Sequence, residues 1–148
     1  MNTIEPSSLK EDFLKKPPNG IPLILIAPSP RTMRKFSGAG YQELLLNREL
    51  SSVLLKYPAD KRPSLAAQKA RELIEKKGSY VMIQDFEMLF DPRYHLNVLR
   101  FFADIARSTR IAVLWCGTMT GNNLVFAEPG YADYQIYYTN NYALYCVK

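Results

Sequence analysis

The stretch from Tyr80 to Glu87 constrains the fold more than any other part of the sequence, because a continuous apolar run ends there in two carboxylates. Gly78 precedes the run, whose large and β-branched side chains are typical of a strand buried on both faces. Ligands of open α/β sheets lie beyond the carboxyl ends of the strands. Asp85 and Glu87 therefore stand where a phosphate-bound metal or an attacking water needs a carboxylate. The alternative is two acidic residues in a solvated loop.

Other apolar runs alternate with helical patterns along the chain. The patterns predict strands at 21–26, 41–46 and 111–115, and helices at 7–16, 48–56, 64–77 and 93–107. After a hairpin signal at Gly121, further strands are predicted at 124–127, 135–138 and 142–147. This alternation predicts an α/β fold with a three-layer, mainly parallel sheet and antiparallel strands at the C-terminal end. We divide the chain into an N-terminal helix and linker, residues 1–20, and a single domain, residues 21–148.

The composition narrows the class of protein. The 148 residues are 47% hydrophobic and 22% charged, which is typical of one globular domain. No apolar run approaches the roughly 20 residues that span a bilayer, so no membrane contact is expected. Residues 1–16 carry three acids and no long apolar core, so we expect no signal peptide and a cytoplasmic location. Two cysteines and one histidine are too few for a disulfide framework or a structural zinc site.

The segment after the 21–26 strand occupies the position of a phosphate-binding loop, between a strand and a predicted helix. The pattern for such a loop is G-x-x-x-x-G-K-[ST], and here Ala27, Thr32, Met33 and Arg34 stand at the four signature positions. Without the second glycine the backbone N–H groups close less easily around a phosphate. Pro28 and Pro30 also remove two of the donors. The candidate anion-binding residues are Ala27, Ser29, Arg31, Thr32, Arg34 and Lys35. The loop stays electropositive, so we expect anion binding to survive without efficient phosphoryl transfer.

Two further groups of side chains are candidates for binding. Thr118 and Thr120 follow the 111–115 strand, where a residue could sense the terminal phosphate of a nucleotide; the alternative is two threonines in a turn. Tyrosines are frequent near the end of the chain, at positions 131, 134, 137, 138, 142 and 145. They are explained by packing in strands, or by a platform for a partner protein or single-stranded nucleic acid.

Several short motifs resemble a known family. They are Asn47–Ser51, Arg62-Pro63, Asp85–Asp91, Leu99-Arg100, Ala106–Ser108, Trp115–Gly117 and Ala127–Tyr134, within residues 21–138. Together they resemble BrxF, the small P-loop-type protein of the third type of BREX phage-exclusion system. The resemblance implies a sheet of P-loop NTPase type. It also implies that Asp85 is the metal-side acid and that Glu87 is the candidate base. The family pattern keeps the glycines and the lysine of the phosphate loop, and this chain departs from it there.

The resemblance implies an accessory subunit of a bacterial BREX-type phage-defence system. We expect it to act mainly through contacts with other defence-system proteins, with binding of ATP and Mg²⁺ weak or lost. One alternative is an ATP- and Mg²⁺-dependent switch or ATPase, with Asp85 and Glu87 catalytic and Arg31, Arg34 or Lys35 replacing the missing lysine. Another is a DNA-binding module, because the net charge is +5 and basic residues line the 61–77 segment.

Overall fold

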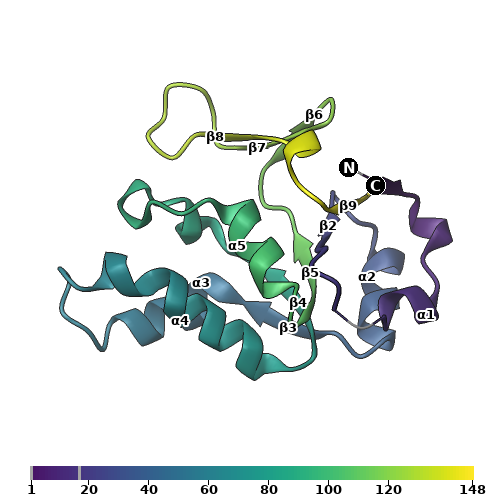
Figure 1. Cartoon of the computed structure of the whole chain (residues 1–148), viewed down its shortest axis with the longest axis horizontal. Helices are drawn as coiled ribbons and strands as arrows, with labels where there is room; N and C mark the ends of the chain where they lie inside the picture. The colour runs from purple at the N-terminus through teal and green to yellow at the C-terminus, as the bar shows by residue number, and fades with distance from the viewer. Residues whose placement is uncertain (1, 17) are drawn as a thin grey trace.

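A computed structural model describes residues 2–16 and 18–148. Its centre is a six-stranded sheet in the order β1-β9-β2-β5-β4-β3, in which every neighbouring pair is parallel (Figure 1). The strands are β1 (Asn2–Ile4), β2 (Leu23–Leu25), β3 (Gln42–Leu45), β4 (Tyr80–Gln84), β5 (Arg110–Leu114) and β9 (Tyr145–Val147). The predicted α/β class and mainly parallel sheet are confirmed.

Helices cover both faces of this sheet. Figure 1 shows α1 (Glu11–Leu14) and α2 (Pro30–Gly38) on one face, and α3 (Leu46–Leu54), α4 (Arg62–Lys77) and α5 (Val98–Ile105) on the other. Side chains alternate along each strand, so two separate cores form. In β2, Ile24 belongs to the core under α3, α4 and α5, whereas Leu23 and Leu25 belong to the core under α1 and α2. Burial on both faces explains why the strands are apolar throughout.

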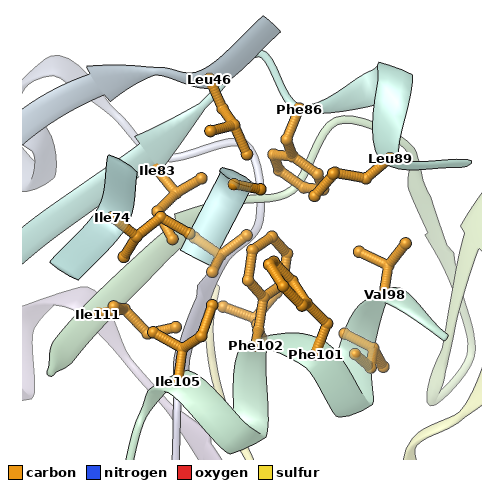
Figure 2. Packing of buried hydrophobic residues seen from close by; sticks show 14 of the residues in the cluster. Leu46, Ile74, Ile83, Phe86, Leu89, Val98, Phe101, Phe102, Ile105 and Ile111 are labelled. Atoms are coloured by element: carbon orange, nitrogen blue, oxygen red, sulfur yellow. The ribbon is translucent and has the colours of Figure 1, made fainter. Parts of the chain in front are cut away.

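The larger core includes the buried Phe86, whose ring Figure 2 shows beside Leu89 and above Phe102. The Phe86 ring meets that of Phe102 from α5 edge to face, with ring centroids 5.1 Å apart. Leu46 and Ile83 surround it from α3 and β4, and both are fully buried. Burying side chains of this size contributes about 1.5–3 kcal/mol each. This packing fixes the position of the chain directly beyond the carboxyl end of β4.

A second, antiparallel sheet follows β5. It contains β6 (Thr118–Thr120), β7 (Asn123–Phe126) and β8 (Gln135–Tyr138), and the predicted hairpin at Gly121 joins the first two. The ring of Phe126 stacks on that of Phe90, with centroids 3.9 Å apart. Because Phe90 follows β4, this contact holds the small sheet against the carboxyl end of the main sheet.

The prediction of an antiparallel strand at 142–147 is wrong. A 3-10 turn at Thr139–Asn141 leads instead into β9, which pairs in parallel with both β1 and β2. The small sheet supplies the long connection that a parallel return requires. β1 belongs to the same main sheet, and Leu9 and Leu14 from the N-terminal segment are buried in the smaller core.

The predicted helix at 93–107 is also wrong at its start. Two 3-10 turns, Glu87–Phe90 and Pro92–Tyr94, and a left-handed His95 come before α5, which is capped by Asn97 through a hydrogen bond to its side chain from the N–H of Arg100. The predicted helix at 7–16 is a 3-10 turn, Pro6–Ser8, followed by the single turn of α1. Prolines that open turns shorten both elements.

Candidate functional site

The segment between β2 and α2 is shorter than predicted. β2 ends at Leu25 and α2 begins at Pro30, so most of the expected loop from Ala27 to Lys35 is helix, and that prediction is wrong. Ser29 caps the helix and Pro30 occupies its first position. Both residues favour the start of a helix because the serine oxygen satisfies a free N–H and proline needs no acceptor. The remaining turn is too short to encircle a phosphate as an eight-residue loop does.

Two of the donors at the start of α2 are already used. Pro30 has no N–H, the N–H of Thr32 donates to Ser29 Oγ at 3.2 Å, and that of Met33 donates to the Ser29 carbonyl at 3.0 Å. The N–H of Arg31 has no partner in this turn, and within the described chain none is seen for the N–H groups of Ala27 and Ser29 before the helix. Anion binding at a helix start depends on several free N–H groups together with a charge that matches the anion. Pro28 and Pro30 supply no donor and Met33 stands at the lysine position, so this turn fits a triphosphate poorly.

The side chains predicted to bind an anion point to different parts of the molecule. Thr32 is 2% exposed, so its hydroxyl is buried beneath the helix. Lys35 donates from Nζ to the Pro6 carbonyl at 2.8 Å and thereby holds the N-terminal segment. Arg31 and Arg34 are exposed on α2, and neither forms an ion pair within the described part of the chain.

Two strand ends share an uncommon backbone conformation. Ala27, after β2, has φ of 41°, and Asp85, after β4, has φ of 48°. Positive φ is uncommon for residues other than glycine, and aspartate tolerates it better than alanine. Such positions persist only where surrounding contacts hold them. Asp85 is exposed at this bend, so its carboxylate is accessible to solvent or to a cation.

Asn47 connects the first turn of α3 to the acidic segment. Its side-chain amide donates to the Glu87 carboxylate, and its amide oxygen accepts from the N–H of Met88 at 3.1 Å. Its own N–H donates to the Asp85 carbonyl at 2.6 Å. The predicted base, Glu87, is therefore bound within the protein. A hydrogen bond across 40 residues leaves no local sequence pattern, so this role of Asn47 could not be predicted from the sequence.

Cys116 follows β5, and the charges of Asp85 and Glu87, which follow β4, act on its thiol. Burial, together with the nearby charges of Glu87 and Asp85, raises the pKa of its thiol to about 12. The thiol therefore stays protonated near neutral pH and is a poor nucleophile. This group of three side chains was not predicted from the sequence, because no local pattern links Cys116 to the two acidic residues that follow β4.

Thr118 begins β6, and its side chain is exposed. Its carbonyl accepts a hydrogen bond from the Trp115 indole at 3.1 Å, and the Val125 carbonyl also lies 3.3 Å from that nitrogen. Trp115 is buried and serves as a core residue that ties β7 to the end of β5. The structure thus places Thr118 at the junction of the two sheets.

A magnesium ion needs only one or two carboxylates when phosphates and water complete its shell. Within residues 2–16 and 18–148, no three side chains among His, Cys, Asp and Glu converge as a metal site. Asp85 is the exposed carboxylate at the end of β4 that could contact such an ion, since Glu87 already accepts from Asn47.

The remaining candidate surfaces are placed as follows. Tyr137 is 4% exposed and accepts the N–H of Val98 through its hydroxyl, whereas Tyr131 and Tyr138 are 66% and 55% exposed. On α4, two of the basic side chains predicted to follow phosphates, Lys69 and Arg71, form ion pairs with glutamates one turn along the helix.

Comparison of the chain with protein-family models, with curated protein sequences and with solved structures finds no match. Among the described residues, no helix combines the length and the apolar character needed to cross a bilayer.

Proposed function

We propose that this protein is a P-loop-like domain that has lost its phosphate grip and serves as an accessory subunit of a bacterial BREX-type phage-defence system. It acts through contacts with other defence proteins, and ATP and Mg²⁺ bind weakly or not at all. The family part of this proposal comes from the motif resemblance to BrxF. The loss of the phosphate grip comes from the geometry at the start of α2.

The order of the strands supports the P-loop part of the proposal. β5 lies between β2, which precedes the modified phosphate loop, and β4, which ends in Asp85. This is the order of the P-loop NTPases in which an additional strand separates the phosphate-loop strand from the acidic strand. The positions of Ala27 and Asp85 beyond the carboxyl ends of their strands agree with where such sheets bind ligands.

The observation that carries the proposal is the hydrogen bonding at the start of α2. The Ser29 hydroxyl and carbonyl take the N–H groups of Thr32 and Met33, and Pro30 has none. A triphosphate bound there would have to break these bonds without a lysine to replace them. The rival interpretation, an ATP-driven switch, also requires Glu87 to be free to accept a proton from water. Asn47 already occupies one acceptor position of that carboxylate and leaves the other oxygen open.

The test distinguishes a role that depends on protein contacts from one that depends on ATP hydrolysis. Phage plating would be measured in cells in which the chromosomal gene is replaced by wild type, by Asp85→Asn or by Glu87→Gln. Both substitutions keep the size of the side chain and remove its charge. We expect a defect in protection on deletion, full restoration by all three proteins, and co-purification of each with a protein of the defence system. Loss of protection in Asp85→Asn with the protein still folded would support the ATP-dependent switch. Unchanged protection on deletion would exclude a role in defence.

A further inference from the structure

A cavity of about 270 Å³ is lined by residues of α3, α4, the loop that joins them and the two 3-10 turns after β4. Leu54, Leu55, Pro63 and Met88 form its apolar walls. Its volume is just below the range of about 300–1,000 Å³ of pockets for drug-sized ligands. The cavity therefore suits one or two side chains of a partner better than a nucleotide.

Leu55 is an apolar side chain that lines this cavity and is left exposed to solvent. It is 69% exposed, more than the other large hydrophobic residues recorded as exposed in the described chain, although it directly follows α3 and lines the cavity. A single exposed leucine is ordinary on a protein surface. An exposed leucine at the rim of an apolar cavity is a feature of interaction sites, because one apolar side chain of a partner can cover the leucine and fill the cavity.

The rim of the cavity is positively charged. Arg62 donates from Nε to the carbonyls of Leu54 at 2.9 Å and Tyr57 at 3.0 Å, so the end of α3 holds it in place. No carboxylate of the described residues lies within ion-pair distance of its guanidinium. Lys56 and Lys61 are exposed in the adjoining loop, which also carries the exposed acid Asp60, so the cations are in excess by one charge there before Arg62 is added. A fixed guanidinium without a carboxylate, beside two further cations, favours an acidic partner.

The opposite side of the rim carries Arg93 and Tyr94. Arg93 pairs with Asp91 at 2.6 Å and its side chain is 73% exposed. Burial raises the pKa of the Tyr94 phenol, and the positive charges of Arg93 and Arg62 act on it in the opposite direction. The carboxylate of Asp91 also raises this pKa, and by more than either arginine lowers it. Tyr94, Arg62 and Arg93 all line the cavity. Two arginines and a hydroxyl at the rim of one apolar cavity form a site for a carboxylate attached to an apolar group.

We propose that this cavity binds a short segment of a partner protein that inserts one apolar side chain and places flanking carboxylates beside Arg62 and Arg93. An acidic, apolar peptide matches the volume, the exposed Leu55 and the charge of the rim. Its biological meaning rests on the proposed function as a contact-making subunit, whereas the binding chemistry follows from the cavity alone.

The test uses the full chain and fluorescein-labelled pentapeptides of the form Glu-Glu-X-Glu-Glu, in which X is leucine, methionine or phenylalanine. Fluorescence anisotropy would be compared with peptides in which X is serine or in which lysines replace the glutamates. We expect the apolar X to strengthen binding at least about tenfold over serine, which corresponds to about 1.4 kcal/mol. We also expect the lysine peptides not to bind, and higher salt to weaken the acidic ones.

Two variants at the cavity and one control variant outside it locate the binding site. Ala59 is exposed and lines the cavity, so Ala59→Phe fills it without disturbing the buried cores. Arg93→Glu reverses a charge at the rim, and Arg100→Glu makes the same change at an exposed position of α5 outside the lining. We expect Ala59→Phe and Arg93→Glu each to weaken the leucine peptide at least about fivefold and Arg100→Glu to leave it within about twofold. Circular dichroism would confirm that each variant is folded.

The proposal is overturned if no acidic peptide binds below about 1 mM, or if Ala59→Phe binds as well as the wild type. The outcome is separate from that of the phage assay. Failure of the peptides with protection intact would leave the role in defence standing. Peptide binding without any effect on phage protection would support the binding site and exclude the proposed role in defence.

Discussion

The side-chain amide of Asn47 donates a hydrogen bond to the carboxylate of Glu87, which lies 40 residues farther along the chain. The amide oxygen of Asn47 also accepts from the N–H of Met88, and the backbone N–H of Asn47 donates to the Asp85 carbonyl. Together these three bonds hold the acidic bend after β4 against the start of α3. The segment that looks most like a catalytic motif in the sequence is therefore held by contacts with a helix, and these contacts also support the left-handed Asp85. Such contacts suit a structural bend as well as they suit a catalytic one.

Removing this connection should destabilise the protein. Asn47→Ala leaves the Met88 N–H and the Glu87 carboxylate without their partner, which we expect to cost about 1–3 kcal/mol in the free energy of unfolding. Urea denaturation measures it. Ser52→Ala serves as the control, because the Ser52 hydroxyl bonds only to a carbonyl one turn back on the exposed face of the same helix. An Asn47→Ala protein as stable as the control would show that the connection contributes nothing.

The sequence allowed β2, β3, β4 and β5 of the main sheet to be predicted, because side chains buried on both faces leave continuous apolar runs, and the turn residues at Gly121 predicted the hairpin. It did not predict β1 or the parallel placement of β9. Both strands are three residues long, and their place in the sheet depends on pairing with residues more than a hundred positions away. Asp85 and Glu87 could be located because they follow an apolar run, whereas the role of Asn47 depends on a fold that brings two distant segments together.

Gly117 should be irreplaceable even by alanine. A Cβ at this position would lie 1.9 Å from the Val125 carbonyl oxygen, so β7 would have to move. We expect Gly117→Ala to cost more than about 2 kcal/mol in unfolding free energy and to shift the fluorescence of Trp115, the sole tryptophan, whose indole N–H bonds to β7.

Gly38→Ala is the matched control, because nothing lies within 4 Å of the added carbon in α2. It should leave the Trp115 emission unchanged and alter the unfolding free energy by no more than about 1 kcal/mol. Equal behaviour of the two variants would mean that β7 does not approach Gly117 as closely as the structure has it.

Arg110 is a buried cation that lacks a carboxylate within the described residues. It is 1% exposed and donates to the Phe13 carbonyl at 3.1 Å, while its Nε and Nη1 have no partner. The guanidinium lies over the Phe13 ring, 5.3 Å from its centroid. Replacing such a group with an apolar one of similar size is often neutral or stabilising, by about 1–4 kcal/mol.

We therefore expect Arg110→Met to unfold at the same urea concentration as the wild type or at a higher one. Arg110→Ala should be less stable than Arg110→Met by about 2 kcal/mol or more, because it leaves a cavity. If Arg110→Met and Arg110→Ala lost stability equally, the bond to Phe13 would matter more than the packing of the side chain.

Stability should fall in alkaline solution. Burial raises the pKa of Cys116, Tyr41 and Tyr137 to about 12 and that of Cys146 to about 11, from ordinary values of 9.0 for cysteine and 10.0 for tyrosine. A raised pKa means that the folded state retains protons that the unfolded state releases. The contribution is complete below about pH 9 and is lost progressively as the pH rises towards 12.

Urea unfolding at pH 7, 9 and 10.5 would measure this loss. We expect similar midpoints at the first two values and a clearly lower one at the third. Cys116→Ala should reduce the decrease, since it removes one of the four groups. A midpoint that does not change up to pH 10.5 would contradict the burial of these thiols and phenols.

The central claim is that the start of α2 cannot hold a triphosphate although it lies at the carboxyl end of a parallel sheet, where α/β proteins bind ligands. Isothermal titration calorimetry of the wild-type protein with ATP and Mg²⁺ tests it most directly. The account predicts no binding heat up to about 1 mM ATP, and the same flat titration for Asp85→Asn. Micromolar affinity in the wild type that disappears in Asp85→Asn would contradict it.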